Sequence, residues 1–362
     1  MLGTTADGAT NPAKNLARTN CGATLQVTTA NEYHKVWGGD SDASALLRED
    51  DTLSYPLAEG ETTFVISFPK VSLLDRFTFV NENGAADGDV TMSVSNYRLP
   101  VQSEKWVPVA AHAPFTGQRL FNASLEGIEG RYVKLTFHVT KWGRIAGLGL
   151  YGSQSLQQFA VRQTAPVQVK NTAVTRRLED MLNFNFANLY ARAHVVFVSS
   201  GAEQSAKRMI DDDVTTSFQF SPADPQPTVI IELAESQRLH RVSAIYKMEK
   251  GRLDVFVLQN LAADPGDLSG AKKVASVSDS TGGGKAALDF DPAGARYVAL
   301  RWTPAQPAGQ HGFEVAEISA FGEMPLTMLS AAALPEVYAY NAPDAVPAPP
   351  VLQAPALPIV SE

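Results

Sequence analysis

The sequence repeats itself. Residues 16–152 and 190–322 align at a nearly constant offset of about 165 residues, so that residues 131–135 match residues 296–300, both beginning Arg-Tyr-Val. The units of solenoid proteins are much shorter, at about 20–50 residues, so a repeat of this length indicates a duplicated domain. We therefore expect two domains of one fold, and the function has to be sought in that duplicated unit.

Inside each copy, short apolar or alternating runs rich in Val, Ile, Phe and Thr are separated by Gly, Pro, Asn and Asp. This pattern is typical of strands joined by turns. The expected strands are 63–68, 75–80, 90–95 and 132–139 in the first copy and 228–233, 241–246, 253–258 and 297–302 in the second. Helical periodicity is almost absent between them, which predicts an all-β fold of two β-sandwiches.

Three segments lie outside the copies: an N-terminal arm at 1–15, a linker at 153–189 and a tail at 323–362. Apolar residues of the linker follow helical spacing. They are Val174, Leu178, Met181, Leu182 and Leu189. We expect a short amphipathic helix that packs across the two sandwiches.

The tail contains eight prolines and no Lys or Arg. Its prolines favour an extended, polyproline-like strand. Leu352, Leu357 and Ile359 are the apolar residues expected to anchor it on a protein partner. The alternative is a disordered linker.

Composition excludes several classes of function. The net charge of −8 and the lack of a Lys/Arg cluster argue against a nucleic-acid partner. The single cysteine, Cys21, allows neither an intrachain disulfide nor a Cys-based metal site. No stretch is apolar enough to span a membrane, and residues 1–23 lack the order of a signal peptide, so a cytoplasmic location stays open beside export.

Catalytic motifs are also missing from the sequence. It has no Gly-x-Ser-x-Gly elbow and no His-Glu-x-x-His zinc motif, and its six histidines are scattered along both copies. We therefore expect a protein that is not an enzyme.

Short motifs of the second copy resemble a known family. Residues 199–201, 206–218 and 228–233 resemble the opening of discoidin domains, also called F5/8 type C domains, some of which are classed as carbohydrate-binding modules. Residues 296–300 and 317–322 look like the closing motifs of the family. The resemblance implies two galactose-binding-like jelly-roll sandwiches joined by a linker with a short helix and followed by the extended Pro-rich tail.

The same resemblance implies a structural Ca²⁺ in the second copy only. The matching residues are Asp211, Asp213, Thr216 and Glu317. Ca²⁺ needs six to eight oxygen ligands, which these residues could supply together with carbonyls and water. The first copy has Arg48, Leu53 and Gly147 at three of these positions and should be metal-free. The alternative for the second copy is a solvated acidic turn whose Asp side chains cap local amides.

A sugar site on such a fold needs an exposed aromatic ring beside planar polar groups, on the loops at one end of the sandwich. The candidates in the first copy are His34, Trp37, Asp40, Lys141, Trp142 and Arg144. The second copy offers a thinner set, which is Gln204, Phe220, His311 and Phe313. Trp106 and Trp302 are expected in the cores, and the alternative for Trp37 and Trp142 is packing beneath their own loops.

Taken together, these features predict a non-catalytic protein that binds a glycan or a cell-surface polymer, as in adhesion. The resemblance places it outside the cell, on the cell surface or in the periplasm. The alternative is a structural subunit of a larger surface or envelope assembly, anchored by its Pro-rich tail.

Overall fold

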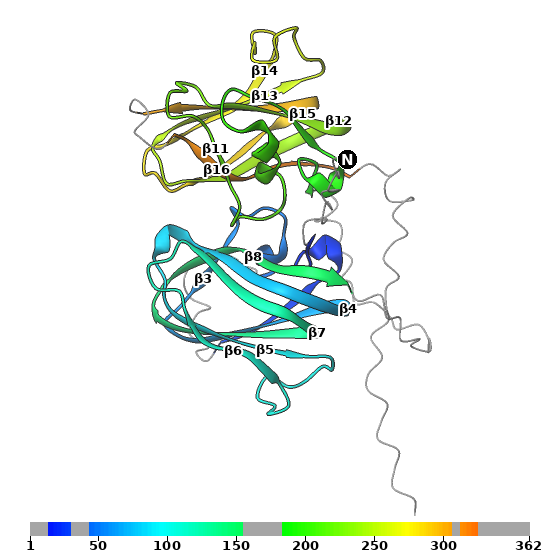
Figure 1. Ribbon diagram of the computed structural model, residues 1–362, viewed down its shortest axis with the longest axis vertical. Coiled ribbons are helices and arrows are strands. Elements are labelled where there is room, and N and C mark those ends of the chain that lie inside the picture. Colours follow the sequence, from blue (N-terminus) through cyan, green and yellow to red (C-terminus); the bar gives the residue numbers. More distant parts are fainter. Residues whose placement is uncertain (1–13, 30–42, 155–182, 306–311, 325–362) are drawn as a thin grey trace, which may run out of the picture.

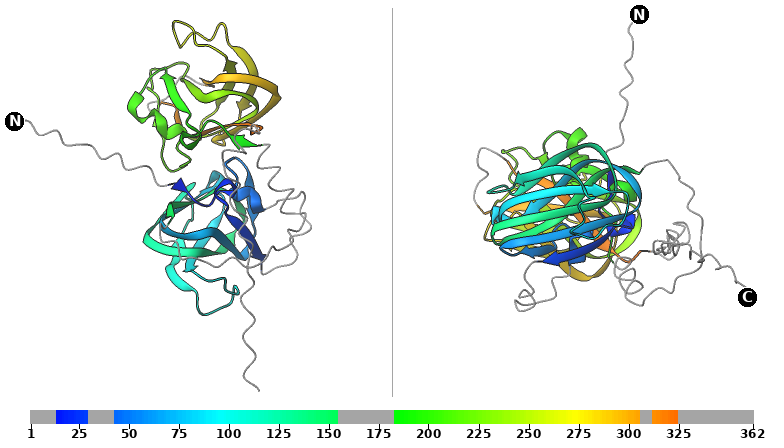
Figure 2. Two further views of the ribbon diagram at one scale, coloured as in Figure 1. Left: turned by 90° about the vertical axis from the view of Figure 1, so that its right-hand side faces the viewer. Right: turned by 90° about the horizontal axis from the view of Figure 1, so that it is seen from below.

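The computed structural model describes residues 14–29, 43–154, 183–305 and 312–324. It consists of two bodies built from antiparallel strands, one for each copy of the repeat (Figure 1). After a turn of 90° about the vertical axis, the same two bodies of strands again lie one above the other (Figure 2, left). The all-β sandwich fold is thus confirmed, whereas the linker helix and the tail anchors Leu352, Leu357 and Ile359 lie outside the described residues.

The first body is an eight-stranded antiparallel sheet with the order β1-β8-β4-β7-β5-β6, to which β2 and β3 add by pairing with β4 and β8. Its strands are β1 (Lys14–Asn15), β2 (Thr24–Thr29), β3 (Ser54–Leu57), β4 (Gly60–Asn81), β5 (Asp87–Ser95), β6 (Val107–Pro114), β7 (Leu120–Lys141) and β8 (Gly143–Gln154). Short 3₁₀ turns join them: η1 (Thr19–Cys21), η3 (Ala43–Leu47) and η4 (Glu82–Gly84).

The second body repeats this plan with the order β11-β16-β12-β15-β13-β14, and β9 and β10 pair with β16 and β12. Its strands are β9 (Phe184–Asn185), β10 (His194–Val198), β11 (Phe218–Gln219), β12 (Thr228–Tyr246), β13 (Gly251–Leu258), β14 (Lys272–Asp279), β15 (Lys285–Pro304) and β16 (Glu314–Gly322). Its 3₁₀ turns are η5 (Leu189–Ala191) and η6 (Glu203–Met209). The sheet therefore begins ahead of the boundary at 190 that the repeat suggests.

The longest strands are continuous where the sequence predicts two separate ones. Residues 63–68 and 75–80 both belong to β4, and 228–233 and 241–246 both belong to β12. Register shifts between Ser67 and Ser72 and between Leu74 and Arg76 bend β4 without ending it. A β-bulge allows such a bend because the ladder of hydrogen bonds resumes beyond it.

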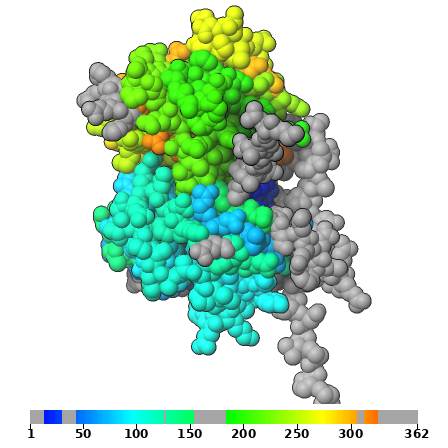
Figure 3. All heavy atoms as spheres, viewed as in Figure 1, coloured from blue at the N-terminus to red at the C-terminus, as the bar shows by residue number. Residues whose placement is uncertain are grey.

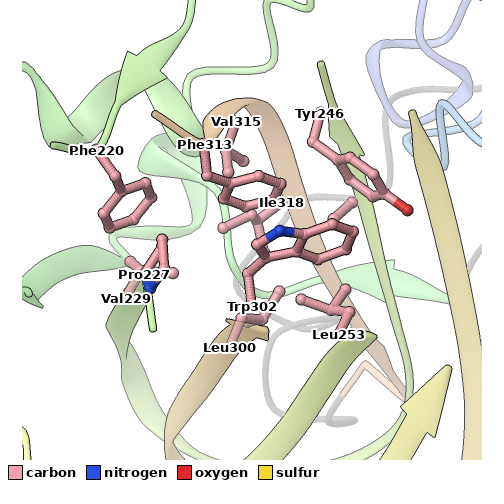
Figure 4. A pocket seen from close by; sticks show the side chains of 11 residues that line it. Phe220, Pro227, Val229, Tyr246, Leu253, Leu300, Trp302, Phe313, Val315 and Ile318 are labelled. Atoms are coloured by element: carbon pink, nitrogen blue, oxygen red, sulfur yellow. The ribbon is translucent and has the colours of Figure 1, made fainter. Parts of the chain in front are cut away.

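Each body has its own apolar core. Trp106 and Trp302 are buried, as predicted, and Trp302 stacks on Phe313 with ring centroids 4.5 Å apart. Figure 4 shows this cluster together with Phe220 and Tyr246. The free volume that it encloses is about 10 Å³, which leaves no room for a ligand.

The two bodies meet in a junction that follows the repeat, and Figure 3 shows their atoms in contact along a continuous seam. Arg76 of β4 donates to the Asp213 carboxylate at 2.5 Å, and Arg241, its counterpart in β12, donates to Asp50, the counterpart of Asp213, at 2.8 Å. Each copy thus binds the acidic turn of the other through the same pair of positions. Such reciprocal contacts characterise a two-fold interface between identical subunits, here built into one chain.

A buried arginine breaks the symmetry at the centre of this junction. Arg18, which is 2% exposed, donates to Asp212 of the second body at 2.5 Å and pairs with Asp51 of its own body at 3.0 Å. The second copy has Asn188 and Val214 at the positions of Arg18 and Asp51. Arginine and its carboxylate partner are thus both present in the first copy and both absent from the second.

Apolar and polar contacts complete the junction. Val80, Ala146, Val214, Ile245 and Ala316 form a buried cluster that both bodies share. Beside it lies a cavity of about 210 Å³, with the ion pair of Glu82 and Lys285 in its wall. Glu82 pairs with Lys285 across the junction and Arg119 donates to the Gly284 carbonyl of the second body at 2.6 Å, so the cavity is part of the docking surface.

Candidate functional site

Trp142 is displayed at a tight connection between two strands that lie on opposite edges of β4. This Trp142 connection is the single residue between β7, which ends at Lys141, and β8, which begins at Gly143, and the Trp142 side chain is 66% exposed. The backbone beside it is held in place, because Gly143 pairs with Leu57 of β3 and a Cβ on Gly143 would lie 2.5 Å from the Ala86 nitrogen. The alternative that Trp142 packs beneath its own loop is therefore wrong.

The charged neighbours of Trp142 have partners on other strands. The Arg144 guanidinium donates to the Ser54 hydroxyl at 2.8 Å and to the Ser54 carbonyl at 3.0 Å. The Lys141 ammonium forms an ion pair with the Asp87 carboxylate, at 3.7 Å. The Trp142 connection thus carries an aromatic face with an ammonium and a planar donor close to it in the chain, which are the groups that pack on a pyranose and bond its hydroxyls.

The other sugar-site candidates are placed differently or not at all. His34, Trp37 and Asp40 lie outside the described residues, as does His311 of the second copy. Gln204 is exposed, but Phe220 and Phe313 are 2% and 6% exposed and belong to the core (Figure 4). The expectation that these two rings serve a ligand loop is wrong, because Phe220 stacks on Phe313, and Phe313 stacks on the buried Trp302.

The acidic turn of the second copy lies inside the junction. Asp212 and Asp213 are 4% and 6% exposed, so the alternative of a solvated turn is wrong. One Asp213 oxygen accepts hydrogen bonds from the Thr215 amide and hydroxyl, and the other accepts from Arg76. Asp213 thus caps its own turn, as that alternative expected, and it also binds the other body.

Glu317 and Asp211 are the predicted ligands that best fit a cation. Glu317 is 2% exposed, and neither of its carboxylate oxygens has a hydrogen-bond partner among the described residues. Burial, reinforced by the nearby Asp211 charge, raises the pKa of Glu317 well above its usual range. Burial also raises the pKa of Asp211 to about 7, although its carboxylate accepts a hydrogen bond from Thr216 at 2.9 Å. An unpartnered buried carboxylate beside a second one is the environment that a hard cation would relieve.

The four expected Ca²⁺ ligands are not drawn into one tight group. The carboxylates of Asp211, Asp213 and Glu317 do not all lie within 4.8 Å of one another, and Arg76 already neutralises Asp213. In the first copy, Gly147 stands where the second has Glu317, and a Cβ there would lie 2.8 Å from the Asp51 carboxylate. The first copy has therefore filled the equivalent space with the Asp51 side chain, which Arg18 neutralises.

A third group of side chains was not predicted from the sequence. Asp89, His112 and His138 present ligand atoms that all lie within 4.8 Å of one another, so two of the six histidines are clustered rather than scattered. The signal that could have revealed them is the strand register, because Asp89 is paired with His138. That register is not readable from the spacing of residues in the chain.

Comparisons with known proteins found matches only among solved structures. No protein-family model matches the sequence, and no curated protein matches it. One matching structure is a fucolectin from the serum of striped bass, Morone saxatilis, at 13% identity and a TM-score of 0.30, covering 86% of this chain and 99% of that one. Another comprises the CBM32-1 and CBM32-2 domains of Clostridium perfringens ZmpB, at 11% identity and a TM-score of 0.31, covering 83% and 92%.

A third match is the family 32 carbohydrate-binding module of C. perfringens NanJ in complex with galactose. It is 14% identical with a TM-score of 0.31, and the match covers 39% of this chain and 99% of that one. These solved structures are lectins and carbohydrate-binding modules, the class that the sequence motifs resemble. The identities and TM-scores are too low to transfer a ligand or a binding residue. Among the described residues, no helix has the length and apolar character needed to cross a membrane.

Proposed function

We propose that this protein binds a glycan or a related surface polymer through the first sandwich, without catalysing a reaction on it. The observation that carries the proposal is the exposed indole of Trp142, whose backbone neighbours are both held by strand pairing, Lys141 with Asp87 of β5 and Gly143 with Leu57 of β3. A large aromatic ring at the surface forgoes the free energy of burial, which amounts to about 25 cal/mol per Å² of apolar area. A sugar ring that packs on the indole would recover that free energy.

Polar groups around Trp142 would orient a bound sugar. Arg144 is held by Ser54, so its planar donors face a sugar without a large loss of side-chain entropy. Lys141, which precedes Trp142 in the chain, would add a second donor. His34, Trp37 and Asp40, which lie outside the described residues, are the further residues of the proposed site. A protein with this activity would work outside the cell, at the cell surface or in the periplasm, in an adhesive role.

A glycan array tests this proposal directly. The wild-type chain should bind a subset of glycans, and Trp142→Ala should lose that binding because the stacking face is gone. Tyr97→Ala is a matched control, since Tyr97 is also an exposed aromatic, at 78%, but lies between β5 and β6. Binding that survives Trp142→Ala and Trp37→Ala together would show that the site is elsewhere.

The alternative function is that of a structural subunit of a surface or envelope assembly. The observation in its favour is the junction, in which two ion pairs at equivalent positions fix the sandwiches together. A two-domain block of this kind is suited to holding a fixed position among other subunits, with the tail residues Leu352, Leu357 and Ile359 as its anchor. Co-purification of the full-length protein with and without the tail distinguishes the two functions.

We propose a bound Ca²⁺ in the second sandwich only. Glu317 and Asp211 would hold it, with Thr216 and Asp213 supplying further oxygens, and its charge would offset the repulsion between buried carboxylates. Its role would be structural, because it would lie beside the junction and away from the Trp142 connection.

A further inference from the structure

A row of metal-binding side chains crosses four neighbouring strands of the first sandwich. Glu61 of β4 lies opposite His138 of β7, and His138 lies opposite Asp89 of β5. Residues directly opposite one another on adjacent strands project from the same face of a sheet. Glu61, His138 and Asp89 therefore stand side by side, and β6 is the next strand in the row.

The fourth member, His112, reaches the row through an irregularity in β6. Met92 of β5 pairs with Ala110 and Val90 pairs with Ala113, so β6 has one residue more than β5 between these pairs. His112 lies in that bulge with a φ of 50°, which is rare for a residue other than glycine. Bulges re-aim side chains, and here the imidazole Nδ1 comes to 2.8 Å from the Asp89 carboxylate.

The resulting group has the composition of a transition-metal site. Asp89, His112 and His138 each offer one ligand atom, and these atoms lie within 4.8 Å of one another. Ligand atoms around a tetrahedral Zn²⁺ bonded at about 2.0–2.1 Å lie about 3.3 Å apart. His112 is 71% exposed and free to rotate by the small amount that this needs. Two imidazoles and a carboxylate are ligands that suit Zn²⁺ and discriminate against Ca²⁺ and Mg²⁺.

Glu61 is a further polar side chain beside the group of Asp89, His112 and His138. Its carboxylate lies 3.9 Å from Nδ1 of His138. At that position it can orient the imidazole from the outer shell or close the coordination sphere itself. The ammonium of Lys134 also interacts with Glu61, and this cation is the neighbouring charge that opposes binding.

We propose that Asp89, His112 and His138, supported by Glu61, form a Zn²⁺-binding site on the outer face of the first sandwich. The site is separate from the acidic turn, which offers carboxylates without imidazoles, and it shares no side chain with the proposed sugar site at the Trp142 connection. Three protein ligands leave a coordination position open to water or to an oxygen donor of a bound molecule.

The test is a titration of the full-length, chelator-treated chain with Zn²⁺ by isothermal titration calorimetry. Removal of an outer-shell partner of a metal site typically weakens affinity about 10- to 100-fold, and removal of a direct ligand should weaken it at least as much. We therefore expect at least a tenfold loss of affinity in both His112→Ala and His138→Ala. His240→Ala is the matched control, since His240 is a partly exposed histidine of the second body with Asn183 as its hydrogen-bond partner.

A second measurement distinguishes loss of the metal site from loss of the fold. The visible absorption of bound Co²⁺ reports tetrahedral imidazole ligation, and it should be lost in His112→Ala, whose substitution removes an exposed side chain. If His138→Ala does not fold, Asp89→Asn replaces it in the titration. Failure of the wild-type chain to bind Zn²⁺ would overturn the proposal, and so would unchanged affinity in both His112→Ala and Asp89→Asn.

Discussion

Replacement of Arg18 by methionine should destabilise the protein far more than the loss of an ordinary surface arginine. Arg18 is the buried cation between two buried carboxylates, Asp51 of its own body and Asp212 of the other. Methionine matches much of the length and apolar volume of the arginine stem but leaves both carboxylates unpaired. Removing one partner of a buried ion pair typically costs about 3–5 kcal/mol.

The free energy of unfolding, measured by urea denaturation, tests this value. Arg252→Met is the matched control, because Arg252 is half-exposed and its partner Asp254 keeps an ion pair with Lys273 at 2.5 Å, so the loss should be about 0–1 kcal/mol. Adding Asp51→Val, the residue of the second copy at that position, should restore part of the loss because one fewer carboxylate is then unpaired. A loss below about 1 kcal/mol in Arg18→Met would refute the role given to this ion pair.

Three further results are expected. Burial raises the pKa of Glu49 to about 7, so its contribution to stability is present below its ordinary range near pH 4.5 and is lost as the pH rises through 7. The free energy of unfolding, measured by urea denaturation from pH 5 to pH 8, should therefore decline, and Glu49→Gln should make the decline shallower without removing it, because the pKa of Asp211 is also raised to about 7; an identical slope in the variant would contradict the assignment. Ca²⁺ should raise the melting temperature of the wild-type chain and not that of Glu317→Gln, and equal shifts in both would remove Glu317 from the site. Deletion of residues 324–362 should leave both sandwiches folded by circular dichroism while abolishing co-purification with protein partners, and full co-purification of the truncated chain would reduce the tail to a linker.

The fold was predictable because its signals are local. Alternating apolar residues mark a strand whatever it pairs with, and the repeated Arg-Tyr-Val motifs of β7 and β15 reveal the duplication directly. The continuity of β4 and β12 was not predictable, because the polar residues between their two halves have the composition of a turn. In the structure the ladder resumes after a bulge, and hydrogen bonds to the neighbouring strands override the local preference.

Part of the sugar site was also predictable, because its signal is local too. Trp142 stands out as an aromatic residue beside Lys and Arg at the end of a strand, and the structure exposes it. The junction was not foreseen, since Arg76 and Asp213 are 137 residues apart and meet because two folded bodies dock. Likewise, His112 joins Asp89 through a bulge that the spacing of the residues does not encode.

The fluorescence of Trp142 during a glycan titration tests the central claim most directly. Trp106 and Trp302 are buried, so with Trp37→Phe as the background, Trp142 is the exposed indole left to report on a ligand. We predict a saturable change in emission with the glycan identified on the array, and its loss in Trp37→Phe/Trp142→Phe. An unchanged emission while calorimetry shows the glycan bound would contradict the account, because the sugar would then lie away from the Trp142 connection.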